Sequence, residues 1–398
     1  MASTLHLFLN LMNFKKLFNR HIAVTFLAIS ITSLFALIAV LAKPLDPVKR
    51  AIQDFSFTDI YYEIQKESTD PETSHLITIV DMTKLTNRAD IARLLADVES
   101  QNPKVVGLDV CFDNEGEDFA GNDSLIQIAE QHKNIVFSLK MLDWKDENTG
   151  FTKSIHSFFH EITDITEGTT NMPRQLYDNM KRRVPVCERY EGKYVPSLVA
   201  QVANHYAEKD LTKGRVEDVN INFSPTYFHV LSPEEVISHP ELIQDIIVLV
   251  GAMYEDADCH WTPIGKIAGV ELLAYGVQSL LYGKEVHNLP FPLLCLVSIV
   301  LIFFVEVLQH MYLNKTSKAK SIFVRYIIGS TYIMSIFTFL FTSILLGLSF
   351  LVFRLYSLSF NLAWALSVIT FLGTSRSMYN ALHDYFNSWL EKRKVGSK

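Results

Sequence analysis

The feature that most constrains this chain is the segment 22–42, IAVTFLAISITSLFALIAVLA, which contains no charged residue. A helix rises about 1.5 Å per residue, so about 20 consecutive apolar residues cross the hydrocarbon core of a bilayer. A cleaved signal peptide has a shorter apolar region and a small-residue cleavage site, whereas KPLDP follows here. The segment therefore predicts an uncleaved transmembrane helix, with a cleaved signal peptide as the alternative.

Three later segments also predict transmembrane helices, namely 289–313, 326–350 and 355–374. The last two are divided only around Arg354, which is typical of a tight hairpin. Glu306 lies near the end of the second predicted span. A carboxylate inside a membrane is costly, so we expect it to reach the interface or to pair with a charge of another protein.

Charge predicts the orientation. Residues 44–286 carry 22 Lys+Arg and 40 Asp+Glu, a net charge of −18, whereas the rest of the chain has a net charge of +11. Basic residues concentrate in 1–21, 314–325 and 375–398, so the positive-inside rule places these segments in the cytoplasm. Residues 43–287 then form one extracytoplasmic domain. We expect a multi-pass protein of the cytoplasmic (inner) membrane with both termini inside and the main domain in the periplasm.

Within that domain, buried β-branched runs alternate with amphipathic helical patterns. The runs are LITIVD (76–81), KVVGLDV (104–110), NIVFSLK (134–140) and IIVLVGA (246–252). This alternation predicts an α/β fold with a mostly parallel sheet and helices on both faces. Residues 55–67 predict a connector that holds the domain away from the membrane, and 143–185 predict an insertion or edge hairpins.

Ligands of parallel α/β sheets bind beyond the carboxyl ends of the strands. Asp81 closes one predicted strand, Asp109 lies near the end of another, and Asp256, Asp258 and His260 follow a third. These residues are candidates for a crevice that holds a cation or a cationic ligand. The alternatives are that the aspartates cap loops and helices, or that they serve catalysis.

The residue patterns do not indicate a metal site, a disulfide framework or a catalytic nucleophile. The domain holds three cysteines without CxxC spacing, the acidic loop lacks the central Gly and distal Glu of a calcium loop, and there is no nucleophile elbow. We therefore expect no metal, no cofactor and no catalytic residue. The acidic charge argues against nucleic acid as a partner.

The segment after the acidic loop predicts a mechanical role. Pro263 restricts a turn, and glycines permit close backbone approach and unusual dihedral angles. The candidate coupling residues are Thr262, Pro263, Gly265, Gly269 and Glu271. Tight helix–sheet packing is the alternative role of the glycines, and Glu271 also suits the dipole of the helix that it begins.

Several short motifs follow one another in a characteristic order along the domain. They are ITIVD, PKVVGLDVCF, RVPVCERYEGKYVPSLVAQVA, INFSP, SPEEVI and VLVGAMYEDADCHWTPIGKIAGVELLAYGVQSLL. In this order they resemble the type-2 CHASE domain, an extracytoplasmic sensory domain of bacterial receptors. The resemblance covers about 44–286, and the layout of one span before and three after is similar. Asp258, Thr262, Pro263, Gly265, Gly269 and Glu271 match positions of its last motif. The resemblance implies a sensory input module.

Such modules are usually fused to a cytoplasmic enzyme, whereas only 376–398 follow the last predicted span here. We therefore expect a non-enzymatic sensor that binds an unidentified small ligand or envelope protein outside and acts on a separate signalling partner inside. The tail offers apolar residues at helical spacing for a partner or for membrane lipid. By analogy with receptors we expect a homo-oligomer. A structural scaffold of an envelope complex is the alternative, and an extracytoplasmic hydrolase is a third.

Overall fold

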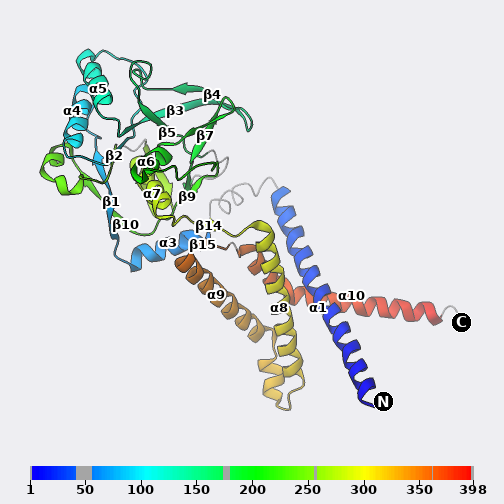
Figure 1. The fold of residues 1–398 in the computed structure, drawn as a ribbon. Coiled ribbons are helices and arrows are strands. Elements are labelled where there is room, and N and C mark those ends of the chain that lie inside the picture. The colour runs from blue at the N-terminus through cyan, green and yellow to red at the C-terminus, as the bar shows by residue number, and fades with distance from the viewer. Residues whose placement is uncertain (1, 42–55, 174–179, 255–257, 361, 396–398) are drawn as a thin grey trace. The chain divides into compact units, whose positions relative to one another are not determined.

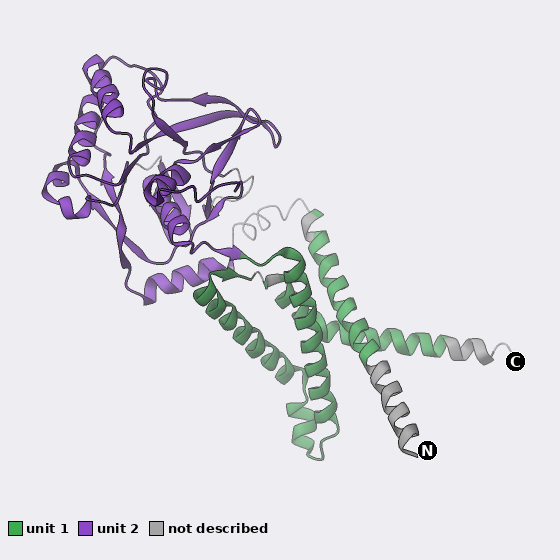
Figure 2. Ribbon diagram, in the orientation of Figure 1, with its two compact units in different colours: residues 1–52, 288–398 green, residues 53–287 purple. Residues whose placement is uncertain are grey.

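The computed structural model describes residues 2–41, 56–173, 180–254, 258–360 and 362–395 (Figure 1). The chain divides into two compact units, residues 53–287 and residues 1–52 with 288–398 (Figure 2). The first unit holds the mixed α/β elements, and the second holds the long apolar helices. Each unit is described by itself below.

The α/β unit is built on a mixed sheet of nine strands. Six neighbouring strands run parallel, and β5 pairs with β3 at their end. The parallel strands are β10 (Thr226–Leu231), β1 (Glu72–Asp81), β11 (Ile247–Gly251), β2 (Val105–Leu108), β3 (Ile135–Asp146) and β5 (Thr166–Thr169). The strands β2 and β11 are buried throughout and β1 is buried over 77–80, as β-branched runs covered on both sides require.

The antiparallel edge lies partly in 143–185, for which the sequence predicted an insertion or edge hairpins, and partly beyond it. β3 forms a hairpin with β4 (Gly150–Ile155), and β7 (Cys187–Tyr190) forms another with β8 (Lys193–Pro196). The two hairpins join through a parallel contact between β4 and β7. This part of the domain therefore extends the sheet with edge hairpins.

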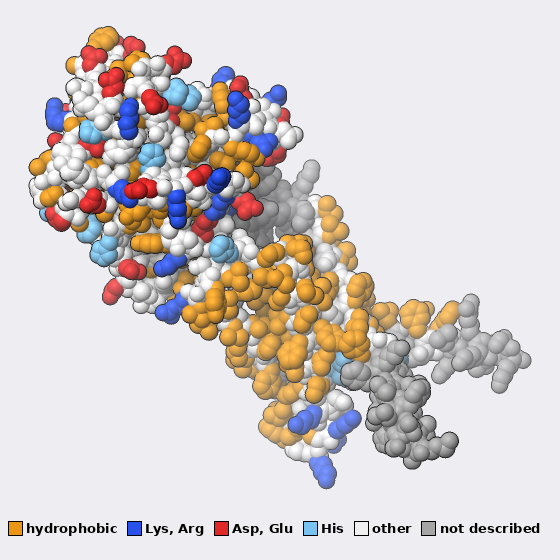
Figure 3. Space-filling view, viewed as in Figure 1, with side chains coloured by type: hydrophobic (Ala, Val, Ile, Leu, Met, Phe, Trp, Pro, Cys, Tyr) orange, Lys and Arg blue, Asp and Glu red, His pale blue; other side chains and the backbone are white. Residues whose placement is uncertain are grey.

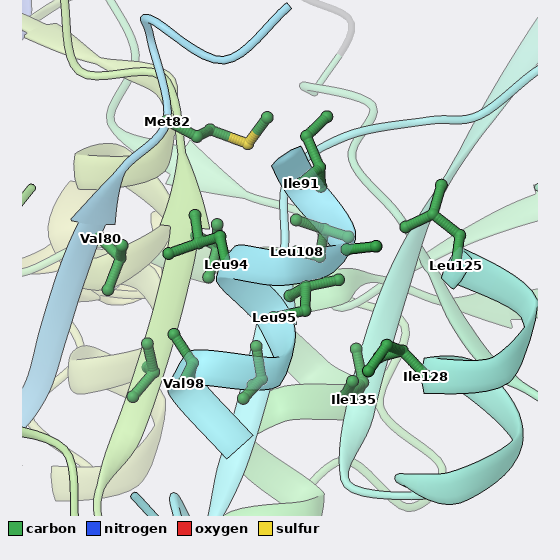
Figure 4. Close-up of a cluster of buried hydrophobic side chains, with 14 of the residues drawn as sticks. Val80, Met82, Ile91, Leu94, Leu95, Val98, Leu108, Leu125, Ile128 and Ile135 are labelled. Carbon is green, nitrogen blue, oxygen red and sulfur yellow. The ribbon is translucent and has the colours of Figure 1, made fainter. Parts of the chain in front are cut away.

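Helices cover both faces of the parallel strands. α4 (Arg88–Glu99) and α5 (Phe119–Gln131) pack on one face in a continuous apolar core. Figure 4 shows Leu94, Leu95 and Val98 of α4 among side chains of the strands and of α5. α6 (Leu198–Ala207) and α7 (Gly269–Tyr282) cover the other face. The predicted α/β domain with a mostly parallel sheet and helices is confirmed.

α6 approaches the sheet closely because β2 carries a glycine on that face. A Cβ atom on Gly107 would lie 2.8 Å from Cγ2 of Val202 on α6. Successive strand residues point to opposite faces, so Val106 and Leu108 instead join the core under α4 and α5. In the strand VVGL the glycine thus faces α6, whereas the larger apolar side chains face α4 and α5.

The segment predicted as a connector forms a helix that packs on the α/β unit. α3 (Phe57–Ser68) begins with a capping box between Ser56 and Asp59. Tyr62 is buried against Phe223, and Arg182 binds Asp59 through two nitrogens at 2.7 and 3.0 Å. The apolar face of α3 therefore belongs to the core of the α/β unit.

Short elements complete the α/β unit. Ser232 forms a capping box with Glu235, and the backbone that follows forms two 3-10 helices, Pro233–Ser238 and Pro240–Leu242, each beginning with a proline. Two small antiparallel pairs lie outside the main sheet. They are β6 (Arg183–Val184) with β9 (Val219–Asn220), and β12 (Cys259–Thr262) with β13 (Gly265–Ala268).

In its described residues, the second unit contains four long helices. They are α1 (Ala2–Leu41), α8 (Phe291–Ser317), α9 (Thr331–Tyr356) and α10 (Ala363–Val395), with a π-helix at Val324–Ile328. The short strands β14 (His287–Asn288) and β15 (Leu358–Ser359) precede α8 and α10. Within the described residues, three helical segments are long and apolar enough to cross a membrane: Phe18–Ile38, Phe291–Ser317 and Thr331–Tyr356.

The prediction of a fourth span at 355–374 is wrong. α9 extends to Tyr356, and α10 begins only at Ala363. The apolar part of α10 then ends before Thr374, so it covers about 16 Å at about 1.5 Å per residue. The apolar run 355–374 therefore combines the last residues of α9 with the first part of α10, and α10 is not among the three candidate spans.

Three of the helices share an apolar core. Val24 and Ala28 of α1 pack with Ile302 and Val305 of α8 and with one face of α10, which contributes Ala365, Val368, Ile369 and Leu372. Most side chains of α9 are exposed, and Figure 3 shows hydrophobic side chains over much of the visible face of these helices. An apolar surface of this kind suits contact with lipid rather than with water.

Glu306 is paired within its own chain, which differs from both roles expected for it. Its side chain is 0% exposed and accepts hydrogen bonds from Arg376 of α10. His21 of α1 lies 3.3 Å away, and Arg376 also donates to Gln309 at 3.0 Å. A buried carboxylate needs partners for its charge, so α8 and α10 are joined here by a polar contact in an apolar bundle.

Candidate functional site

A cavity of about 660 Å³ lies at the carboxyl ends of the parallel strands. Thr83 follows β1, Asp109 follows β2, and Thr170 follows β5. Ser138 and Lys140 of β3 line the same space. Small-molecule sites of proteins have volumes of about 300–1,000 Å³ and occur at this edge of α/β sheets.

The sheet fixes the position of Asp109 in this cavity. Its backbone N–H donates to Val250 O at 2.8 Å, which continues the pairing of β2 with β11 beyond the last strand residue. Burial is the main cause that raises the pKa of Asp109 to about 7, and the neighbouring Asp258 carboxylate raises it further. Lys140 acts in the opposite direction. Asp109 can therefore gain or lose a proton near neutral pH.

Asp258 lies against the first residue of α7. A Cβ atom on Gly269 would be 2.7 Å from Oδ2 of Asp258, so glycine leaves the space that this carboxylate fills. A negative charge is stabilised at a helix N-terminus by the unpaired N–H groups and the helix dipole. Asp258 therefore links the cavity to α7.

His260 lies on β12 and also lines the cavity. Burial lowers the pKa of its imidazole, while the charge of Asp258 acts in the opposite direction. Lys140 and Asp258 thus bring a basic and an acidic side chain to the cavity, and Asp109 adds a carboxyl group whose pKa is raised to about 7.

The candidate aspartates do not all occupy the cavity lining. Asp81 accepts hydrogen bonds from the N–H groups of Thr83 and Met253 at 3.0 and 3.1 Å. It therefore ties the loop after β1 to the loop after β11, which is the capping role that the sequence left open. Asp256 lies outside the described residues.

Three of the coupling residues, Thr262, Pro263 and Gly265, lie in a compact hairpin beside α7. Thr262 and Gly265 end the paired strands β12 and β13, with Pro263 in the two-residue turn between them. Thr262 Oγ1 donates to Gly265 O at 2.8 Å, and Gly265 has a φ of 113°, which L side chains rarely adopt. Lys66 of α3 binds the turn at Ile264 O, at 2.8 Å.

Glu271 lies in the first turn of α7. Burial raises the pKa of its carboxyl group, and a backbone hydrogen bond at Ala268 opposes this. Glu271 is not among the residues that line the cavity, so its position suits the start of the helix.

Sequence reasoning missed Lys140, Ser138 and Cys111, which line the cavity together with the acidic residues. The signal was present for Lys140, because it ends the run NIVFSLK just as Asp81 ends LITIVD. The rule that ligands bind at the carboxyl ends of parallel strands applies to any polar side chain there, not only to carboxylates.

A comparison with protein families finds that the CHASE2 domain model matches residues 31–308. The chain belongs to the CHASE2 family. The CHASE2 match begins within α1, covers the α/β unit and ends within α8. CHASE2 domains are extracytoplasmic sensory domains. Neither the search of curated proteins nor that of solved structures found a match.

Proposed function

We propose that this protein is a membrane-anchored sensor whose CHASE2 domain binds a small molecule in the cavity at the carboxyl edge of the sheet. The observation that carries this proposal is the cavity of about 660 Å³ with ionisable groups of both signs. It is large enough for a small ligand, and its polar groups converge from several strands and from the β12–β13 hairpin.

The charges favour a ligand with one cationic and one anionic group, such as a free amino acid or a betaine. Asp258 and Asp109 are suited to the cationic group, and Lys140 to the anionic group. Apolar side chains in the lining, such as Leu273 and Met172, are suited to the rest of the ligand.

We propose that α7 receives the signal. A ligand shifts a conformational equilibrium only by its different affinity for the two states. Asp258 contacts both the cavity and the first residue of α7, so a ligand that draws this carboxylate into the cavity changes the contact at Gly269. Residues 283–290 join α7 to α8, and the proposed relay continues through the membrane helices to a separate partner.

For the location, we propose the cytoplasmic (inner) membrane, with the N-terminus in the cytoplasm and the CHASE2 domain in the periplasm. The basic residues before α1 and between α8 and α9 support this orientation. The expected cytoplasmic C-terminus rested on a fourth span, so it is not part of this proposal. We also propose that the protein is a homo-oligomer and that it is not an enzyme.

The test uses the full chain in lipid nanodiscs and a panel of the free amino acids and small betaines. A ligand of the cavity raises the thermal midpoint in proportion to the logarithm of its concentration. Asp258→Asn and Lys140→Met should each abolish this rise. Asp123→Asn is the matched control, because Asp123 is exposed on α5 and outside the cavity lining.

Three other results would count against this proposal. A panel without any midpoint shift would argue against a zwitterionic ligand. Loss of an envelope complex in Asp258→Asn, without any ligand effect, would support the scaffold role. Turnover of a panel compound that disappears with Asp258→Asn or His260→Gln would support an enzyme.

A further inference from the structure

A second cluster of ionisable groups lies outside the lining of the cavity. Glu167 of β5 meets two histidines from the loop after β4, His156 and His160. The Nδ1 atoms of His156 and His160 lie 2.6 and 2.8 Å from Glu167 Oε2. The two imidazole rings face each other with centroids 4.3 Å apart. Three potential metal ligands therefore point to one place.

The loop that carries the histidines is anchored in the core. Phe159 is fully buried and contacts the rings of Phe112 and Phe137. The N–H of Phe158 donates to Phe112 O, and the N–H of His160 donates to Ser157 O, both at 2.8 Å. The two imidazoles are thus held by a short loop whose backbone position is fixed on both sides.

The groups around the cluster orient it further. Ser157 N–H donates to Glu167 Oε1 at 2.9 Å, which leaves Oε2 directed at the histidines. His156 Nε2 lies 3.0 Å from Ser154 Oγ. Metal-binding histidines usually use their second ring nitrogen for such a hydrogen bond, and metal-binding carboxylates are usually hydrogen-bonded as well.

We propose that His156, His160 and Glu167 bind a divalent transition-metal ion, namely Zn²⁺. Two imidazoles and one carboxylate form the ligand set of zinc sites that keep one position open. An imidazole binds a metal ion through an unprotonated ring nitrogen, so with Nδ1 on the ion the N–H proton of the neutral ring is on Nε2. Glu167 is only 8% exposed, and the ion compensates its buried charge.

The geometry needs only a small adjustment. Ligand bonds of about 2.0–2.2 Å in a tetrahedral site place the ligand atoms roughly 3.3 Å apart. The two Nδ1 atoms therefore move away from Oε2 by about half an ångström, which side-chain rotation can supply. The side chains of His156 and His160 are 36% and 45% exposed, so water can reach the fourth position.

The ion would stabilise one side of the cavity. Ile155, next to His156, pairs with Lys140, and Thr170 follows the strand that carries Glu167. Lys140 and Thr170 both line the cavity. The metal site does not depend on the proposed ligand, because its three side chains are outside the cavity lining.

The test measures Zn²⁺ binding to the full chain in detergent after removal of metals with a chelator. We expect one Zn²⁺ per chain after desalting, a rise in thermal midpoint with Zn²⁺, and visible ligand-field absorption with Co²⁺. His160→Gln and Glu167→Gln should each weaken binding at least about tenfold. His160 is exposed, so its replacement should leave the metal-free protein folded.

The matched control is His132→Gln, because His132 Nδ1 lies 3.1 Å from Glu99 Oε2 in a pair with one imidazole. Neither His132→Gln nor Asp258→Asn should change Zn²⁺ binding. The proposal is overturned if the wild-type chain retains no stoichiometric Zn²⁺, or if both His160→Gln and Glu167→Gln bind it as tightly as the wild type. In the first case the cluster is only a hydrogen-bonded arrangement.

Discussion

At the residue scale, Asp109 makes the stability of the CHASE2 domain depend on pH. Its pKa is about 7 in the folded protein, compared with an ordinary value of 3.8. The fold therefore favours the protonated carboxyl group. The stability that this group contributes is full below about pH 4 and decreases until the pH passes about 7.

Asp109→Asn removes this titration. We expect the free energy of unfolding of the variant, relative to wild type, to rise between pH 4 and pH 8 by on the order of 1–3 kcal/mol. Denaturation of both proteins at a series of pH values measures this difference, with Asp123→Asn as the control. A difference that stays constant over this range would contradict a buried, titrating Asp109.

Gly269 provides a second prediction at this scale. Alanine normally favours a helix over glycine by about 1 kcal/mol. Here its Cβ would meet the Asp258 carboxylate at 2.7 Å, so we expect Gly269→Ala to destabilise the protein by about 1–3 kcal/mol. Thermal unfolding measures the change.

Two further variants identify the cause of that change. Gly373→Ala is the control, because Gly373 is a helical glycine of α10 with open space around its Cβ position. Asp258→Ala together with Gly269→Ala should recover part of the loss, because the two residues are in direct conflict. Equal losses in Gly269→Ala with and without Asp258 would show that another contact is responsible.

At the element scale, the ion pair between Glu306 and Arg376 explains how α10 attaches to α8 without being a complete span. The pair is buried, and Gln309 and His21 contribute further contacts to it. Removing one partner leaves an uncompensated charge in an apolar bundle.

We expect Arg376→Gln to lower the free energy of unfolding by roughly 3–5 kcal/mol, because it leaves the Glu306 carboxylate without its cationic partner. Unfolding of the full chain in mixed detergent micelles measures this. Replacing both Glu306 and Arg376 by methionine should cost less than Arg376→Gln alone. Asp384→Asn, at an exposed position of α10, should have little effect. An Arg376→Gln protein as stable as the wild type would contradict the role of the pair.

At the scale of the whole molecule, the proposed orientation rests on the charge distribution and on the three candidate spans, and it can be tested directly. We expect a cysteine at Asn148 to react with a membrane-impermeant thiol reagent from the periplasmic side. A cysteine at Lys320 should react only after the membrane is permeabilised. Both positions are exposed, and the wild-type protein with its four half-buried cysteines is the control. Protection of position 148 together with labelling of position 320 would reverse the orientation.

Some tertiary features had a clear signal in the residue pattern, and others did not. The runs around Val80, Val106 and Val248 predicted buried parallel strands, because a strand covered on both faces must be apolar throughout. The sequence did not predict the order of these strands in the sheet, because any of the runs can pair with any other. The pairing of β11 between β1 and β2 is what brings Asp109 near Asp258.

The sequence by itself determined three of the four predicted apolar spans, the acidic domain and the α/β class of that domain, because hydropathy, charge and periodicity are local properties. It also identified Asp109, Asp258 and His260 as neighbours of strand ends. Only the tertiary structure decided that Lys140 joins them, that His156 and His160 meet Glu167, and that Arg376 pairs with Glu306. These contacts join residues far apart in the chain or on separate elements, so they depend on strand order and helix packing, which no local pattern encodes.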